Sequence, residues 1–75
     1  MSDAELLRAA ASAAGYDLTT PRARRGFAAV LGVEDRSLVY WLAGRSLDRS
    51  TTVRHVCRAM LARPRIARDL LAVAD

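Results

Sequence analysis

The sequence predicts an all-α protein, a compact bundle of about five short helices, and three observations support this. Signals for the start and the end of helices recur along all 75 residues. No stretch alternates apolar and polar residues as a half-buried strand does, and no Asn-Gly or Asp-Gly pair marks a hairpin. The hydrophobic fraction of 52% is mostly Ala, Leu and Val, with one Trp, two Tyr and one Phe, which favours small interlocking helices.

The first predicted helix begins after Ser2 and ends before Gly15. The residues "SDAE" at 2–5 have the spacing of a capping box, with Ser2 as the N-cap and Glu5 three residues later. Gly15 is the residue type that most often follows the end of a helix. The apolar residues of this segment share one stripe: Leu6, Leu7, Ala10 and Ala14.

Thr20 followed by Pro21 predicts a second helix at about residues 21–31, because proline is preorganised for the first helical position. Gly26 costs about 1 kcal/mol relative to Ala inside a helix, so we expect a small residue here to permit close packing of the next helix. The inward side of the helix is apolar and the outer side is basic. The inward residues are Phe27, Val30 and Leu31, and the outer ones are Arg22, Arg24 and Arg25.

A third helix is predicted at about residues 35–43, between two glycines. Gly32 ends the second helix, Val33 fills the turn, and Glu34 or Asp35 begins the third. Gly44 ends the third helix. We expect its apolar side in the core, and this side consists of Leu38, Trp41 and Leu42.

Two further helices are predicted towards the C-terminus. Leu47 is the apolar anchor of the loop "RSLDRS", and Ser50 or Thr51 caps a helix that continues to about residue 62. Pro64 ends this helix and begins a fifth, at about residues 64–74. The apolar stripes are Val53, Val56, Cys57, Met60 and Leu61 in the fourth helix, and Ile66, Leu70 and Val73 in the fifth.

The charge of the chain favours a polyanionic partner. All twelve basic residues are Arg, and the net charge is +4. Residues 1–19 hold one Arg and three acids, a net −2, whereas residues 20–75 hold eleven Arg and five acids, a net +6. Guanidinium groups suit bidentate contacts with phosphate and with guanine. The alternative interpretation is that this charge serves only solubility.

Several functions are disfavoured by what the sequence lacks. Cys57 and His55 are the only residues of their kinds, so neither an internal disulfide nor a zinc site is expected. No nucleophile–base pair, phosphate loop or carboxylate pair is evident, so we expect no enzyme, no cofactor and no small-molecule substrate. The N-terminus is acidic, and no apolar run approaches the ~20 residues that span a bilayer. We therefore expect a cytoplasmic protein with no membrane partner.

Residues 21–43 fit a helix-turn-helix, two helices joined by a short glycine-containing turn. In "FAAVLGVEDRSLVYWLAGR", Ala28 supplies the small residue of the first helix and Gly32 the turn. Val33, Leu38 and Trp41 are suited to fill the angle between the helices. We expect the whole chain, residues 1–75, to form one domain built on this motif.

The third helix would then present an outer face to the DNA major groove, which admits an α-helix. The base-contacting candidates are Asp35, Arg36, Val39 and Tyr40. Arg36 suits the O6 and N7 atoms of guanine, and Val39 suits a thymine methyl group. Tyr40 suits a phosphate or a sugar, while Asp35 suits N4 of cytosine or only caps the helix. The phosphate-contacting candidates are Arg22, Arg24, Arg25 and Arg45.

The segment "LGVEDRSLVYWLAGR" resembles the helix-turn-helix of Xre/Cro-like repressors. The region 31–62, with "EDRSLVYWL" and later "TTVRHVCRAMLARP", is similar more particularly to the small anti-CRISPR-associated (Aca) repressors of phages and mobile elements. The resemblance implies a compact helical dimer that binds an inverted repeat in a promoter and represses an anti-CRISPR operon. It also places Arg36 at a recognition-helix arginine position. Glu34, in place of the usual Ser or Thr cap, and Val39, in place of a polar residue, depart from the pattern.

The leading hypothesis is thus a sequence-specific, DNA-binding transcriptional repressor that needs no cofactor. One alternative is a protein-interaction module, such as a phage inhibitor or adaptor, and another is an antitoxin with a DNA-binding helix-turn-helix. We expect a homodimer on double-stranded DNA. Its interface is predicted on the fifth helix, at Ile66, Leu70 and Leu71, unless this helix only covers the core of its own chain.

Overall fold

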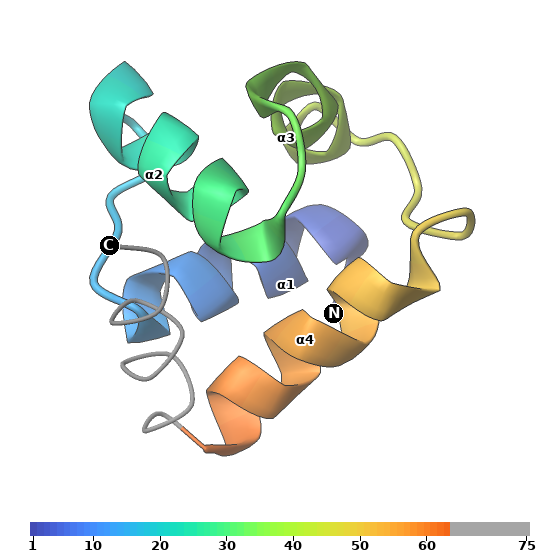
Figure 1. Cartoon of the computed structure of the whole chain (residues 1–75). Coiled ribbons are helices and arrows are strands. Elements are labelled where there is room, and N and C mark those ends of the chain that lie inside the picture. The colour runs from blue at the N-terminus through green and yellow to red at the C-terminus, as the bar shows by residue number, and fades with distance from the viewer. Residues whose placement is uncertain (64–75) are drawn as a thin grey trace.

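The structure is a computed structural model that describes residues 1–63, and these residues form four α-helices and no strand (Figure 1). The all-α prediction is confirmed for this part of the chain. The predicted fifth helix, at residues 64–74, lies outside the described residues. The helices are α1 (Asp3–Ala13), α2 (Pro21–Leu31), α3 (Asp35–Leu42) and α4 (Thr51–Ala62).

Helix α1 is at the centre of the arrangement. It packs against α4 and against α3, and α2 packs against α3. In the view of Figure 1, α2 and α3 lie above α1, and α4 lies below it. None of the helices within residues 1–63 has the length and apolar character needed to cross a membrane.

Two helix starts are capped as the sequence predicts, and two are not. The Ser2 hydroxyl accepts a hydrogen bond from the Glu5 amide at 3.2 Å and lies 3.1 Å from the Glu5 carboxylate. Thr20 caps α2 in the same way, with its hydroxyl accepting from the Ala23 amide at 3.3 Å. Glu34 and Ser50 occupy the N-cap positions of α3 and α4, but their side chains make no capping hydrogen bond. The first turns of α3 and α4 therefore depend on other contacts.

The helix ends confirm the role of the glycines. Gly15, Gly32 and Gly44 have φ values of +85°, +71° and +115°, a region in which glycine has no steric penalty. After each glycine the chain turns back, and the next amide donates to a carbonyl in the last turn, as in a Schellman motif. These bonds are Tyr16 to Ala11 at 2.8 Å, Val33 to Ala28 at 3.0 Å and Arg45 to Tyr40 at 3.0 Å.

The core between the helices contains most of the residues that the apolar stripes predict. Leu47 is fully buried, which confirms it as the anchor of the loop before α4. Cys57 is also buried, and this burial raises the pKa of its thiol to about 11. Val30, Leu31 and Val33 are only partly buried against the core. The largest fully buried side chains are Phe27, Leu7, Leu38, Leu47, Met60 and Cys57.

The prediction that Gly26 permits close packing of α3 is wrong, because its neighbour is Tyr16. A Cβ atom at Gly26 would lie 2.8 Å from Cε1 of Tyr16, in the connector between α1 and α2, and its three nearest neighbours all belong to that ring. The Tyr16 ring also packs on Phe27, with 5.7 Å between the ring centroids. Gly26 therefore makes room for the Tyr16 side chain and not for α3.

An ion-pair network holds the loop between α3 and α4 in place, and no pattern in the sequence predicts it. Asp3 Oδ2 accepts from the Leu47 amide at 2.8 Å and from Nη2 of Arg54 at 3.0 Å. Arg54 also donates to Asp48 at 3.1 Å. The Leu47 amide and the Arg54 guanidinium hold the pKa of Asp3 below its ordinary value. The first turn of α1 is thus linked to the loop and to α4.

Candidate nucleic-acid interface

Helix α3 has one side in the core and one side in solvent. Leu38 is fully buried and Trp41 is 8% exposed, which confirms that both belong to the core. On the opposite side Arg36 is exposed, Val39 is 38% exposed and Tyr40 is 47% exposed. Apart from Met1, Val39 and Tyr40 are the only large hydrophobic residues exposed within residues 1–63. We call Arg36, Val39 and Tyr40 the outer face of α3.

Arg45 extends this outer face beyond the end of the helix. The turn at Gly44 brings the Arg45 guanidinium over the Tyr40 ring, with Cζ 5.1 Å from the ring centroid. A guanidinium at this distance is attracted to the face of an aromatic ring. The pair places a positive charge beside the most exposed aromatic ring of α3.

A basic hollow lies beyond the end of α3, and its lining includes an arginine that no pattern in the sequence indicates. Arg49 lines it together with Trp41, Arg45, Ser46 and Ser50. Guanidinium and hydroxyl groups are donors, so their chemistry suits an anion. Arg49 follows Arg45 by four positions, but in a loop this spacing predicts no common face. Only the fold of residues 45–50 shows that the two arginines line one hollow.

The three arginines of α2 differ in their surroundings. Arg22 and Arg25 are exposed, and neither side chain makes a hydrogen bond within residues 1–63. Arg24 is half-buried and donates from Nε to Oδ1 of Asp35 at 2.7 Å and from Nη2 to Oδ2 at 3.2 Å. The hydrogen bonds from Arg24 hold the pKa of Asp35 below its ordinary value. Two predicted site residues thus contact each other across the turn that joins α2 to α3.

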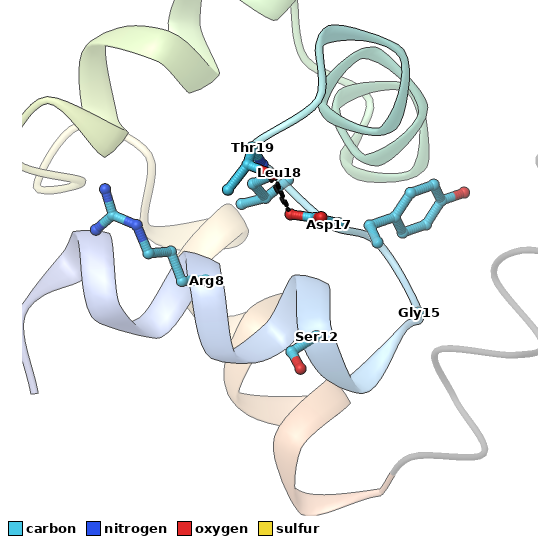
Figure 2. A pocket seen from close by; sticks show the side chains of 7 residues that line it. Arg8, Ser12, Gly15, Asp17, Leu18 and Thr19 are labelled. Carbon is cyan, nitrogen blue, oxygen red and sulfur yellow. Dashed lines mark hydrogen bonds between the residues drawn. The ribbon is translucent and has the colours of Figure 1, made fainter.

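A second hollow, between α1 and the connector to α2, has different chemistry (Figure 2). Its carboxylate, Asp17, accepts hydrogen bonds from the amide and hydroxyl of Thr19 at 3.0 and 2.6 Å. Arg8 donates to the Leu42 carbonyl at 3.2 Å. These polar groups shape the connector and join α1 to α3. The residues lining the hollow are Arg8, Ser12, Gly15, Tyr16, Asp17, Leu18 and Thr19.

Among residues 1–63, no three His, Cys, Asp or Glu side chains are placed to hold a metal ion. The predicted dimer residues Ile66, Leu70 and Leu71 lie outside the described residues. Comparison of the chain with models of protein families, with curated proteins and with solved structures finds no match. The candidate site therefore rests on the geometry of residues 1–63 and on the sequence.

Proposed function

We propose that the protein is a sequence-specific DNA-binding repressor, with residues 21–43 as a helix-turn-helix and α3 as its recognition helix. One observation above all supports this proposal. The outer face of α3 combines an arginine with two exposed apolar side chains, while the opposite side of the same helix is fixed in the core. A rigid helix with such a face suits the major groove, where base edges offer both hydrogen-bond acceptors and methyl groups.

Each residue of the outer face has a role in this proposal. Arg36 donates two hydrogen bonds to O6 and N7 of a guanine, the commonest specific contact of this kind. Val39 packs on the methyl group of a thymine. Tyr40 contacts a sugar or donates to a phosphate, beside the Arg45 guanidinium that lies over its ring.

Arginines on two sides of α3 supply the phosphate contacts. Arg22 and Arg25 lie in the first half of α2, and both are exposed. Arg45 and Arg49 line the hollow beyond the end of α3. Phosphate contacts on both sides of a recognition helix would set its register in the groove without selecting a sequence.

We further propose that two copies bind an inverted repeat. The described residues extend 28 Å along their longest axis, less than the roughly 34 Å between half-sites one turn of DNA apart. One copy would contact only a few base pairs, which is too little to single out a promoter among the competing sites of a genome. The resemblance to anti-CRISPR-associated repressors favours the same symmetric arrangement at a promoter.

Selection from a random pool of DNA duplexes tests this function. The purified full chain is incubated with the pool, bound duplexes are recovered and sequenced, and the cycle is repeated. We expect one enriched motif with two-fold symmetry, bound more weakly as the salt concentration rises. A pool that stays random after repeated cycles, at low salt and with folded protein, would refute sequence-specific binding.

The exposed Val39 and Tyr40 also favour a second candidate, a protein-interaction module that docks through the outer face of α3. The dependence of binding affinity on salt concentration distinguishes the two functions. The formation of a protein–DNA complex releases counterions. A plot of log affinity against log salt concentration is therefore a steep straight line with a negative slope. A docking contact made mainly by Val39 and Tyr40 would show a shallow dependence, and the protein would not be retained on DNA.

A further inference from the structure

The side-chain contact between Arg24 and Asp35 joins the beginnings of α2 and α3. Two nitrogen atoms of Arg24 donate to the two carboxylate oxygens of Asp35, at 2.7 and 3.2 Å. Within residues 1–63 these are the only side-chain hydrogen bonds between α2 and α3. Both side chains are shielded in part, with exposed fractions of 26% and 35%. A bidentate pair of this kind fixes the relative orientation of both groups as well as their distance.

No capping side chain stabilises the start of α3, so this contact is important there. Glu34, at the N-cap position, makes no side-chain capping hydrogen bond, so the usual means of fixing a first turn is missing. Asp35 is the first residue of α3, and Arg36, the proposed guanine contact, is the next. The pair therefore orients the turn from which the base-contacting side chain projects.

The ion pair with Asp35 also limits the ability of Arg24 to contact a phosphate of DNA. If Arg24 turned to a phosphate, the Asp35 carboxylate would lose both of its hydrogen bonds from Arg24 while it lies beside the negatively charged DNA backbone. Arg22 and Arg25 would break no hydrogen bond by turning to a phosphate, because neither side chain makes one within residues 1–63. The charge of Arg25 also lowers the pKa of Asp35, but less than the hydrogen bonds from Arg24 do. Within residues 1–63, the three arginines of α2 thus divide into one that is hydrogen-bonded to Asp35 and two that make no hydrogen bond.

We propose that Arg24 and Asp35 are a positioning pair, which holds the first turn of α3 against α2 and does not itself contact DNA. The phosphate contacts of α2 are then made by Arg22 and Arg25 alone. Asp35, in turn, acts on recognition only through the placement of Arg36. This inference rests on the proposed DNA-binding function and assigns different roles to neighbouring charged residues within it.

The test uses the double variant Arg24→Met/Asp35→Asn, which keeps the net charge of the wild type. Affinities for the selected duplex and for a scrambled duplex are measured by fluorescence anisotropy over a range of salt concentrations. We expect the slope of log affinity against log salt to match the wild type, because no phosphate contact is lost. We also expect the ratio of the two affinities to fall several-fold, because α3 is less well oriented.

Arg25→Met is the matched control. It removes one proposed phosphate contact, so the salt slope should flatten by about 0.9, with a similar loss of affinity for both duplexes. If the double variant flattens the slope by the same amount, Arg24 contacts phosphate and the inference is wrong. An unchanged affinity ratio in the double variant would equally refute the positioning role.

A measurement on the wild type covers the case in which the double variant does not fold. The Nε–H resonance of Arg24 is followed by NMR as the selected duplex is added. We expect it to stay near its position in the free protein, while the corresponding resonance of Arg25 moves. A large shift at Arg24 would overturn the inference. A wild type that binds no duplex at all would instead reject the proposed function, and the inference with it.

Discussion

Arg36 is the residue on which the proposed base recognition depends most. It is exposed on α3, next to the start of the helix, and it is not part of the core to which Leu38 and Trp41 belong. We expect Arg36→Ala to lower the affinity for the selected duplex by about 1–3 kcal/mol and to leave the thermal midpoint almost unchanged. Arg58→Ala removes an exposed arginine from α4 and serves as the control. Equal affinity of Arg36→Ala and wild type in a titration would contradict the assignment.

Trp41 has the opposite role, since its side chain supports the fold. It is 8% exposed and belongs to the buried cluster that includes Leu38 and Leu47. Truncation of a buried tryptophan costs about 3–5 kcal/mol, a large share of the roughly 5–15 kcal/mol that stabilises a domain. We expect a much lower urea midpoint for Trp41→Ala and a smaller loss for Trp41→Phe. A midpoint equal to the wild type would place Trp41 outside the core.

At the scale of elements, the contact between Gly26 of α2 and Tyr16 of the connector can be measured. Alanine has the higher helix propensity by about 1 kcal/mol, but its Cβ would lie 2.8 Å from the Tyr16 ring, and overpacking costs about 1–3 kcal/mol. We expect Gly26→Ala to destabilise the protein by about 1 kcal/mol in urea denaturation. In a Tyr16→Ala background the same change should be stabilising. Stabilisation in both backgrounds would show that the ring yields without cost.

The ion-pair network at Asp3 links α1 to the loop before α4 and to α4 itself. It predicts that the stability of the protein depends on pH. The pKa of Asp3 is lowered in the folded protein, so its contribution is complete above its unfolded pKa of about 3.9. This contribution is lost as the pH falls through the lower folded pKa. We expect Asp3→Asn to lower the urea midpoint at pH 7, and the difference from wild type to narrow below about pH 4.

Glu34→Gln is the control for this pH series, because Glu34 is exposed and makes no capping hydrogen bond. Its midpoint should follow that of the wild type across the series. A difference between Asp3→Asn and wild type that stays constant down to pH 2 would show that the loss is not linked to ionisation of Asp3.

The helices could be predicted from the sequence because their signals are local. The signals that start and end a helix act within a few residues, and they include Ser2, Thr20 and the three glycines with positive φ. An apolar stripe is likewise visible in the sequence of its own helix. The contacts that shape the candidate site are not local. Asp3 reaches Leu47, and Arg24 reaches Asp35 across a turn. No spacing rule connects such positions, so the sequence showed two independent DNA-contacting candidates where the structure has an ion pair.

At the scale of the whole molecule, the sequence predicts that dimerisation depends on the segment 64–74, which lies outside the described residues. In the helix that the sequence predicts there, two overlapping apolar stripes would be wider than one packing face requires, and they consist of Ile66, Leu70, Leu71 and Val73. We expect Leu71→Glu to sediment as a monomer with helical circular dichroism and to bind the selected inverted repeat poorly. A wild type that sediments as a monomer even at high micromolar concentration would contradict the dimer.

Contact between the outer face of α3 and DNA is the central claim, and an NMR titration tests it most directly. The labelled full chain is titrated with the selected duplex, and amide and side-chain shifts are followed residue by residue. The account predicts the largest changes at Arg36, Val39 and Tyr40, with smaller ones at the first turn of α2 and at Arg45 and Arg49. Changes concentrated on the hollow between α1 and its connector, or on the middle of α4, with α3 unaffected, would contradict it.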